Sequence, residues 1–356
     1  MRQGQARNVP TNRLAAFIQA MPKVELHVHL EGAIQPASLL ALATRNGVAL
    51  PAANVEELQE WYTFTSFPHF IEIYLTVSAC LRTPDDIELI AREFLAEQAR
   101  QHIWYSEVTY TAYTHYATKG LSFGDQLAAL NRARAWATTA LGTTMGLIID
   151  IPRTISAEEG LLVADWAIAG MADGVVALGL GGPEVDNPPE RYAQAFSRAR
   201  DAGLRRVPHA GETVGAPSIW GALRTLHADR IEHGVRCLED PTLVAALRDR
   251  RIPLDVCPTS NVCLGVSSSI AAHPLPRLLA EGLLVTINSD DPPMFNTTLT
   301  DEYVALADAF GYGMQDLERL ALNGLEASLL PAKDRVAQAE RFAGEFLALH
   351  DAAQQR

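Results

Sequence analysis

The sequence has few cysteines, no lysine across its middle and no long apolar run, and each shortage excludes a class of protein. The four cysteines (Cys80, Cys237, Cys257 and Cys263) form no C-x-x-C pair, which argues against a disulfide framework and a thiolate zinc site. No run of 18 or more apolar residues occurs, so we expect no transmembrane helix. The opening MRQGQARNVPTNR leads into no apolar segment of signal-peptide type, so we expect a cytoplasmic protein.

Basic residues are also scarce relative to acidic ones. The chain has 42 acidic and 29 basic residues and a formal net charge of −13. A surface of that sign repels phosphate backbones, so we expect no nucleic-acid partner and no membrane partner. With 48% hydrophobic residues among 356, the chain has ample material for a folded core. These features fit an enzyme that acts on a small molecule, and they leave the oligomeric state open.

Short apolar runs alternate with longer amphipathic segments along the chain. The alternation is typical of βαβ units, and eight such units favour an α/β fold of the (β/α)8 TIM-barrel type with extra helices. The expected strands are Val24–Leu30, Trp104–Thr111, Gly146–Ile151, Gly174–Leu180, Arg205–Ala210, Arg230–His233, Ile252–Val256 and Leu284–Asn288. The expected helices include Pro84–Gln101, Phe123–Leu141, Ala157–Ala169, Pro189–Ala202, Pro217–Leu226, Asp240–Arg248 and Pro274–Glu281.

No linker divides the chain, so we expect one metal-dependent hydrolase barrel over residues 1–356. Residues 1–21 form a lead-in, and residues 300–356 are expected to be helical and to pack outside the barrel. The segment 50–83 is an insertion rich in aromatic residues, among them Phe64 and Phe67.

Polar clusters follow directly on the apolar runs, where a barrel of this type carries its catalytic groups. His27 and His29 end the first run, and alternate residues of a strand point to the same face. His209 ends the fifth run, and Glu212 follows it closely. Taken alone, an H-x-H pair is weak, His209 is explained as a hydrogen-bonded core residue, and Glu212 as a helix cap.

Two further clusters end the sixth and eighth runs. His233 alone is most simply a buried histidine, and Asp290-Asp291-Pro292 alone is ordinary turn chemistry. Four such coincidences at strand ends favour a shared site. Three imidazoles and one carboxylate suit zinc, and the expected ligands are His27, His29, His209 and Asp290. Glu212, His233 and Asp291 then remain for proton transfer and hydrogen bonding, as metal-assisted hydrolysis requires.

At these positions the sequence closely resembles the adenosine deaminase family of the amidohydrolase superfamily. The matching stretches occur in the family's order over nearly the whole barrel: PKVELHVHLEGA, HAGE, RIEHGVR, VCPTSN, HPLP and NSDDP. The H-x-E and P-C-x-x-C signature of the cytidine-deaminase type of zinc site is absent.

The resemblance implies a role for each matching residue. One Zn²⁺ per chain and its activated water would be held by the four expected ligands, and the water would add to C6 of a purine. Glu212 would protonate N1, His233 would orient the water and help to remove its proton, and Asp291 would bind N7. The backbone N–H of Gly182 would bind N3. Phe64 and Phe67 lie where the family keeps a hydrophobic lid, although core packing explains them equally well.

The substrate implied by the resemblance is a 6-aminopurine nucleoside, with adenosine converted to inosine and ammonia as the leading choice. The family's animal enzymes have HLDG, whose aspartate contacts the ribose, where this chain has Glu31 within HLEG. Adenine deaminases share HLEG but have serine in place of Gly182. Bacterial relatives of this pattern include deaminases of 6-amino-6-deoxyfutalosine in menaquinone synthesis, whose benzoate would need a cation such as Arg82 or Arg153. Surface positions are the simpler expectation for both arginines. Aminodeoxyfutalosine is therefore the second candidate and adenine the third.

Two other classes stay open. A catalytically silent purine-binding relative would lack a ligand or Glu212, and the sequence lacks neither. An amidohydrolase acting on a cyclic amide often bridges two metals with a modified lysine. No lysine occurs between Lys119 and Lys333, which counts against that two-metal site.

Overall fold

The computed structural model describes residues 12–354. Positions 1–11 of the expected lead-in, and with them most of the opening MRQGQARNVPTNR, lie outside the described residues. Eight strands form a parallel sheet whose spatial order is the order of the chain. The strands are β1 (Lys23–His29), β2 (Ile103–Tyr110), β3 (Thr144–Pro152), β4 (Val175–Gly181), β5 (Arg205–Ala210), β6 (Ile231–His233), β7 (Leu254–Val256) and β8 (Val285–Ile287). All eight expected strands are confirmed, each within two residues at either end.

The chain following β8 brings the sheet back to β1. The backbone N–H of His29 donates to the Asp290 carbonyl at 2.9 Å, and that of Asp290 donates to the His27 carbonyl at 3.2 Å. The result is a nearly closed barrel, which confirms the expected (β/α)8 fold. The contact also joins two of the expected metal-ligand segments side by side.

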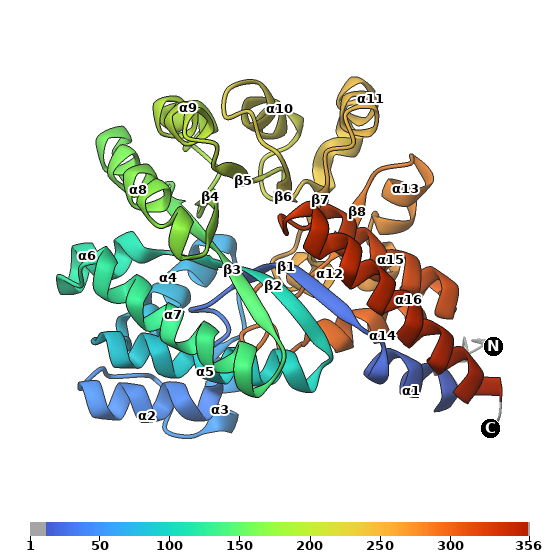
Figure 1. The fold of residues 1–356 in the computed structure, drawn as a ribbon. Coiled ribbons are helices and arrows are strands. Elements are labelled where there is room, and N and C mark those ends of the chain that lie inside the picture. The colour runs from blue at the N-terminus through green and yellow to red at the C-terminus, as the bar shows by residue number, and fades with distance from the viewer. Residues whose placement is uncertain (1–11, 355–356) are drawn as a thin grey trace, which may run out of the picture.

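Helices surround the strands (Figure 1). Helix α5 (Pro84–Arg100) comes directly before β2. The helices that follow β2 to β7 are α6 (Ala112–Lys119), α7 (Phe123–Ala140), α8 (Ala157–Ala169), α9 (Ala193–Asp201), α10 (Ala216–Arg224), α11 (Pro241–Asp249), α12 (Pro258–Cys263) and α13 (Leu275–Ala280). Short 3-10 turns occur at Met171–Asp173, Pro189–Tyr192, Val235–Glu239 and Ile270–Ala272. The expected helices are confirmed, the one over Pro189–Ala202 as a 3-10 turn running into α9.

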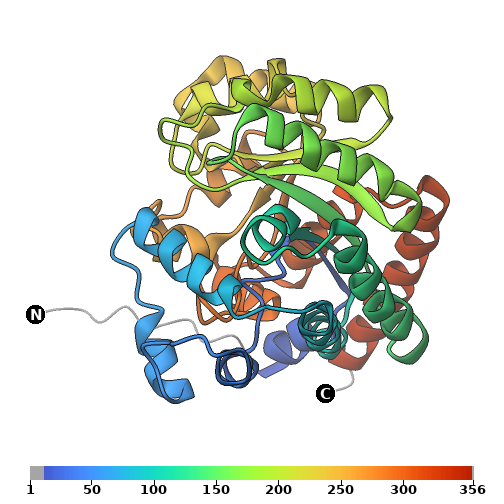
Figure 2. The same cartoon turned by 90° about the vertical axis from the view of Figure 1, so that its left-hand side faces the viewer.

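The remaining helices elaborate the barrel. They are α1 (Asn12–Ala20), α2 (Pro36–Asn46), α3 (Val55–Trp61), α4 (Phe67–Ala79), α14 (Leu299–Phe310), α15 (Met314–Ala327) and α16 (Ala332–Gln354). The C-terminal region is helical as expected, and α15 packs against β8 and β1. The aromatic insertion holds α3 and α4, which Figure 2 shows in light blue to the left of the strands. None of the described helices is both long enough and apolar enough to cross a membrane.

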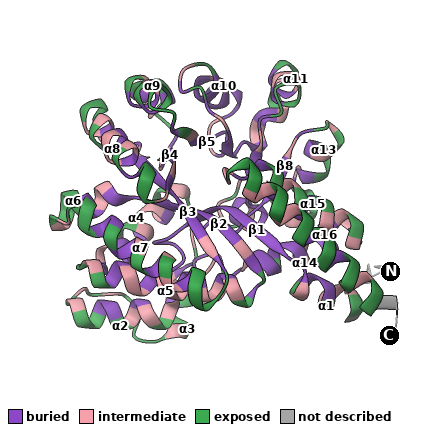
Figure 3. Ribbon diagram, viewed as in Figure 1, coloured by how far each residue is buried: buried purple, intermediate pink, exposed green. Residues whose placement is uncertain are grey.

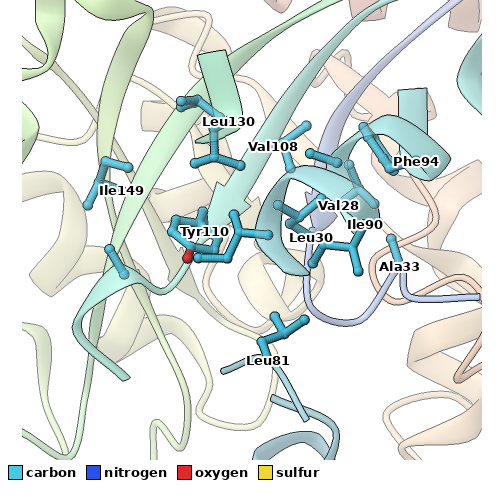
Figure 4. Close-up of a cluster of buried hydrophobic side chains, with 14 of the residues drawn as sticks. Val28, Leu30, Ala33, Leu81, Ile90, Phe94, Val108, Tyr110, Leu130 and Ile149 are labelled. Atoms are coloured by element: carbon cyan, nitrogen blue, oxygen red, sulfur yellow. The ribbon is translucent and has the colours of Figure 1, made fainter. Parts of the chain in front are cut away.

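Apolar side chains between the strands and the helices form the core. The helices turn buried faces inward and exposed faces outward (Figure 3), as their amphipathic sequences require. In one part of this core Val28 and Val108 of adjacent strands lie near Ile90 and Phe94 of α5 (Figure 4). The strands are buried on both faces, which explains why they appear in the sequence as continuous apolar runs.

The interior of the barrel holds charged residues below the site. The Arg230 guanidinium lies 2.6 Å from the Glu107 carboxylate and 2.5 Å from that of Asp255, and all three side chains are buried. Buried charges are tolerated when paired in this way. This network of paired charges fills part of the barrel interior, and the candidate site lies at the carboxyl ends of the strands.

Candidate active site

The four expected ligands lie together at the end of the barrel where the carboxyl ends of the strands meet. His27 and His29 come from β1, His209 from β5, and Asp290 from the segment after β8. The Nε2 atoms of His27 and His29 each lie 3.4 Å from Oδ1 of Asp290. Nε2 of His29 lies 3.1 Å from Nε2 of His209. All four side chains are buried, so their nitrogen and oxygen atoms face one another around a small common space.

The arrangement fits a bound cation. Nε2 of His27 is buried and has no hydrogen-bond partner among the described residues, while Nδ1 of the same ring lies 3.3 Å from the Asp255 carbonyl. Nδ1 of His209 lies 2.6 Å from Glu232, so the opposite nitrogen of that ring is also directed into the cluster. Imidazoles that face a metal normally use their other nitrogen in this way. His233 also lies within reach of His27 and His209 in a possible donor group.

Glu232 was not singled out from the sequence, although it lies inside the matching stretch RIEHGVR. Burial alone would raise the pKa of Glu232, but the neighbouring His209 and His27 rings lower it to about 2. Thr109 donates to its other oxygen at 3.2 Å. Glu232 is thus held as a carboxylate that fixes the orientation of His209.

We expect Glu232→Gln to weaken metal binding by roughly 10- to 100-fold, the usual cost of losing such a supporting group. Competition with a chelator measures the change, and Glu158→Gln, at an exposed position of α8, is the matched control. An unchanged metal affinity in Glu232→Gln would show that the carboxylate does not support His209.

Glu212 and His233 lie beside the ligand cluster. Nε2 of His233 is 3.7 Å from Oε1 of Glu212 and 3.9 Å from Oδ2 of Asp290. Burial, reinforced by the Asp290 carboxylate, raises the pKa of Glu212 well above its usual value. Burial and the positive charge of His27 lower the pKa of His233. A protonated carboxyl and a neutral imidazole side by side form an acid and a base suited to proton transfer.

The loop that carries Glu212 is fixed from below by Glu184. The Glu184 carboxylate accepts hydrogen bonds from the backbone N–H groups of Gly211, Glu212 and Thr213 at 2.8–2.9 Å. Three donors on one carboxylate hold the short turn after β5 in place. Glu184, which lies outside the HAGE stretch, therefore fixes the backbone that carries Glu212.

Asp291 is also buried beside the cluster. Burial and the Asp290 carboxylate raise its pKa well above the usual value, so Asp291 has a hydroxyl to donate. A Cβ atom at Gly32 would lie 1.6 Å from Oδ1 of Asp291, so glycine at this position makes room for the carboxyl group. Ser260 donates to Oδ2 of Asp290 at 2.6 Å and fixes the neighbouring ligand.

Two residues of the site have unusual backbone conformations. His233 and Asp290 have φ values of 63° and 66°, in the left-handed region that non-glycine residues rarely occupy. Such strain persists where the surrounding structure holds it and is common at functional sites. Gly182 has φ 94°, and a Cβ there would meet nothing closer than 3.7 Å. A φ in this region favours glycine at position 182.

A cavity of roughly 780 Å³, including its open mouth, leads to these residues. His29, His209, Glu212, His233, Asp290 and Asp291 line it together with Gly182. Helix α4 forms an apolar wall through Phe67, Phe70, Ile71, Tyr74 and Leu75. Among the described lining residues there is no lysine and no arginine.

Two residues expected to contact substrate lie elsewhere. Glu31 is fully buried and does not line the cavity, and its carboxylate accepts from Thr111 N–H at 3.1 Å and lies 3.0 Å from Nε2 of His115. The Tyr74 hydroxyl, 3.3 Å from Glu31, stands between that carboxylate and the cavity. Phe64 also lies outside the cavity lining, where its ring packs against Phe70 and Phe295, whereas Phe67 lies at the cavity.

Arg153 differs from the surface position expected for it. Its guanidinium is buried and donates to the Asn187 and His209 carbonyl oxygens, each at 2.6 Å. It therefore supports the backbone of a ligand strand and does not line the cavity. Asp150 of β3 lies within an apolar run of the sequence and was not predicted as a site residue, yet it lines the cavity.

Comparison with known proteins agrees with this geometry. The family model described as adenosine deaminase matches residues 22–343. An aminodeoxyfutalosine deaminase of Streptomyces coelicolor is 41% identical over 328 residues, covering 91% of this chain and 84% of the relative. An adenine deaminase of Chlorobium phaeobacteroides is 38% identical over 315 residues, covering 88% and 93%.

Solved structures give the same result. An adenine deaminase from Arthrobacter aurescens superposes with a TM-score of 0.87 at 35% identity, covering 93% of this chain and all of the other. An amidohydrolase from Burkholderia ambifaria with bound zinc superposes with a TM-score of 0.89 at 28% identity, covering 97% and 96%.

The barrel and its histidine–aspartate cluster define a metal-dependent hydrolase of the amidohydrolase type. The chain belongs to the adenosine deaminase family, whose members act on C–N bonds.

Proposed function

We propose that this enzyme hydrolytically deaminates a 6-aminopurine nucleoside, with adenosine as the leading substrate. Deamination of an aminopurine is the chemistry that the family and the deaminase relatives support. The observation that carries the proposal is the position of Glu212 and His233 at the ligand cluster, with Nε2 of His233 3.7 Å from Oε1 of Glu212 and 3.9 Å from Oδ2 of Asp290.

The metal in this proposal is one Zn²⁺, held by His27, His29, His209 and Asp290. The donor set of three imidazoles and one carboxylate suits zinc, and the related amidohydrolase from Burkholderia ambifaria contains zinc. When bound, zinc lowers the pKa of a coordinated water towards about 7 and so makes hydroxide available as a nucleophile.

The surrounding side chains orient the purine and move protons. Glu212 donates its proton to N1 as the water oxygen adds to C6, and His233 takes one proton from that water. The C6–N6 bond then breaks as the amino group takes the proton from His233 and leaves as ammonia. The proton of the new C6 hydroxyl returns to Glu212, which leaves a C6 carbonyl and N1–H in the product. Asp291 donates to N7, since burial keeps its carboxyl protonated. The N–H of Gly182 is presented to N3 at the other edge of the ring. The three contacts to N1, N7 and N3 would orient the ring with C6 at the ligand cluster.

The cavity favours a neutral nucleoside over the alternatives. The cavity opens to solvent, so a sugar attached to the purine can extend towards its mouth. The carboxyl groups of Asp150, Glu212, Asp290 and Asp291 line it, and no lysine or arginine is among the lining residues that the structure describes. A benzoate or phosphate group would find no cation there, which places adenosine ahead of aminodeoxyfutalosine.

Aminodeoxyfutalosine is the second candidate because of two observations. The S. coelicolor relative named for that substrate is 41% identical. The apolar wall of α4 would also pack against an aromatic ring at the mouth, with its carboxylate in solvent. Adenine is the third candidate. A catalytically silent role is disfavoured because each acid–base group is present.

Measurement of kcat/KM for adenosine, aminodeoxyfutalosine and adenine on zinc-loaded enzyme tests the ranking. We expect adenosine to be at least the equal of both rivals. A deficit of a hundredfold or more against either one, about 2.7 kcal/mol in transition-state binding, would reject adenosine as the leading substrate.

A further inference from the structure

Asp150 is a buried carboxyl group that the catalytic scheme does not use. It lies on β3, is only 3% exposed, and lines the cavity beside Thr111 and Gly181. Its Oδ1 has no hydrogen-bond partner among the described residues, and no ion pair joins it to the ligand histidines. An unpartnered polar group of this kind is costly to bury unless a partner arrives with the ligand.

The neighbouring strand is shaped around this carboxyl group. Asp150 and Gly179 are register partners in β3 and β4. A Cβ atom at Gly181 would lie 2.5 Å from Oδ2 of Asp150, and one at Gly179 would lie 2.9 Å from Oδ1. Two glycines therefore leave space for the carboxyl at the wall of the cavity. The carboxyl of Glu31, by contrast, already has partners in Thr111 and Tyr74.

The chemistry of the proposed substrate limits what Asp150 can bind. Ring nitrogens N1, N3 and N7 of a 6-aminopurine are acceptors, and their partners are assigned to Glu212, Gly182 and Asp291. The 6-amino group lies at the ligand cluster. The remaining donors of a nucleoside are its sugar hydroxyls, and a carboxylate oxygen accepts from a hydroxyl.

We propose that Asp150 is a specificity residue that accepts a hydrogen bond from a sugar hydroxyl of the nucleoside substrate. This inference rests on the proposed function, because it requires a nucleoside in the cavity. It assigns to Asp150 the sugar contact that the sequence had suggested for Glu31.

The test compares Asp150→Ala with the wild-type enzyme on adenosine and on its 2′-deoxy, 3′-deoxy and 5′-deoxy analogues. Loss of one partner from a buried hydrogen bond costs about 1–3 kcal/mol, so we expect kcat/KM for adenosine to fall roughly 5- to 150-fold. The analogue lacking the contacted hydroxyl should show no such loss. Gly181→Ala, whose Cβ would displace the carboxyl, should give the same selective pattern.

Asp249→Asn, at an exposed position on α11, is the matched control, with metal content and thermal unfolding measured for every variant. Equal losses on adenosine and all three analogues would show a structural role and overturn the inference. A loss confined to adenine, whose N9–H is a donor, would also overturn it. If the wild-type enzyme deaminates no nucleoside, the proposed function itself fails, which is a different outcome.

Discussion

Replacement of Glu212 by glutamine is expected to lower kcat by roughly 10²- to 10⁴-fold or more while the metal stays bound. The amide keeps the size of the side chain and its place above Glu184, because that contact is made through the Glu212 backbone N–H. It removes the acidic proton that burial retains on Glu212. Loss of protonation at N1 therefore slows addition at C6 without disturbing the ligands.

Steady-state kinetics and elemental analysis of the same preparation measure the two effects. Glu158→Gln is the control, since it makes the same chemical change on the exposed face of α8. Loss of metal from Glu212→Gln would mean that Glu212 is a ligand and not the proton donor. A kcat within tenfold of wild type would reject its role altogether.

Replacement of His27 by alanine is expected to have the second large effect, loss of the bound metal together with loss of activity. His27 is completely buried, and its rings approach those of His209 and His233 with centroids 4.7 and 4.6 Å apart. Its Nε2 lies 3.4 Å from Asp290 and has no hydrogen-bond partner within residues 12–354. Without this ring the cluster loses a central nitrogen donor, and the remaining donors cannot enclose the ion.

Zinc content per chain, measured by elemental analysis after dialysis, gives the result directly. His227→Ala is the control and should keep its metal, because His227 is exposed and precedes β6, whereas the expected ligands are buried at the carboxyl ends of their strands. Full zinc occupancy in His27→Ala would overturn the assignment of this ligand. Full occupancy combined with lost activity would indicate a role in positioning the substrate.

The main features of the fold could be predicted because they are local. Apolar runs of strand length recur between helical segments, and each strand of the barrel is buried on both faces. The ends of those runs carry His27, His29, His209 and Asp290, and the barrel places strand ends together. The helices α3 and α4 were not predicted, although the residues of α4 that form the cavity wall recur at helical spacing: Phe67, Phe70, Ile71, Tyr74 and Leu75.

The substrate contacts were harder to predict because they depend on side chains from different strands. Glu31 follows directly on a ligand motif, yet Thr111, His115 and Tyr74 enclose it. Asp150 sits unmarked in an apolar run, yet it reaches the cavity because glycine occupies the facing positions of β4. No feature of one strand indicates whether its neighbour is glycine at the matching register.

The sequence by itself therefore determined the class of fold, the ligand types and the family, because these depend on residue type, on spacing along one strand and on order along the chain. Only the tertiary structure decided which carboxyl groups face the cavity, which ones support a ligand ring, and which arginine is buried. Those outcomes depend on register between strands and on the path of the loops. The packing of the whole barrel sets the register and the loop paths, so they cannot be predicted from any one segment of the sequence.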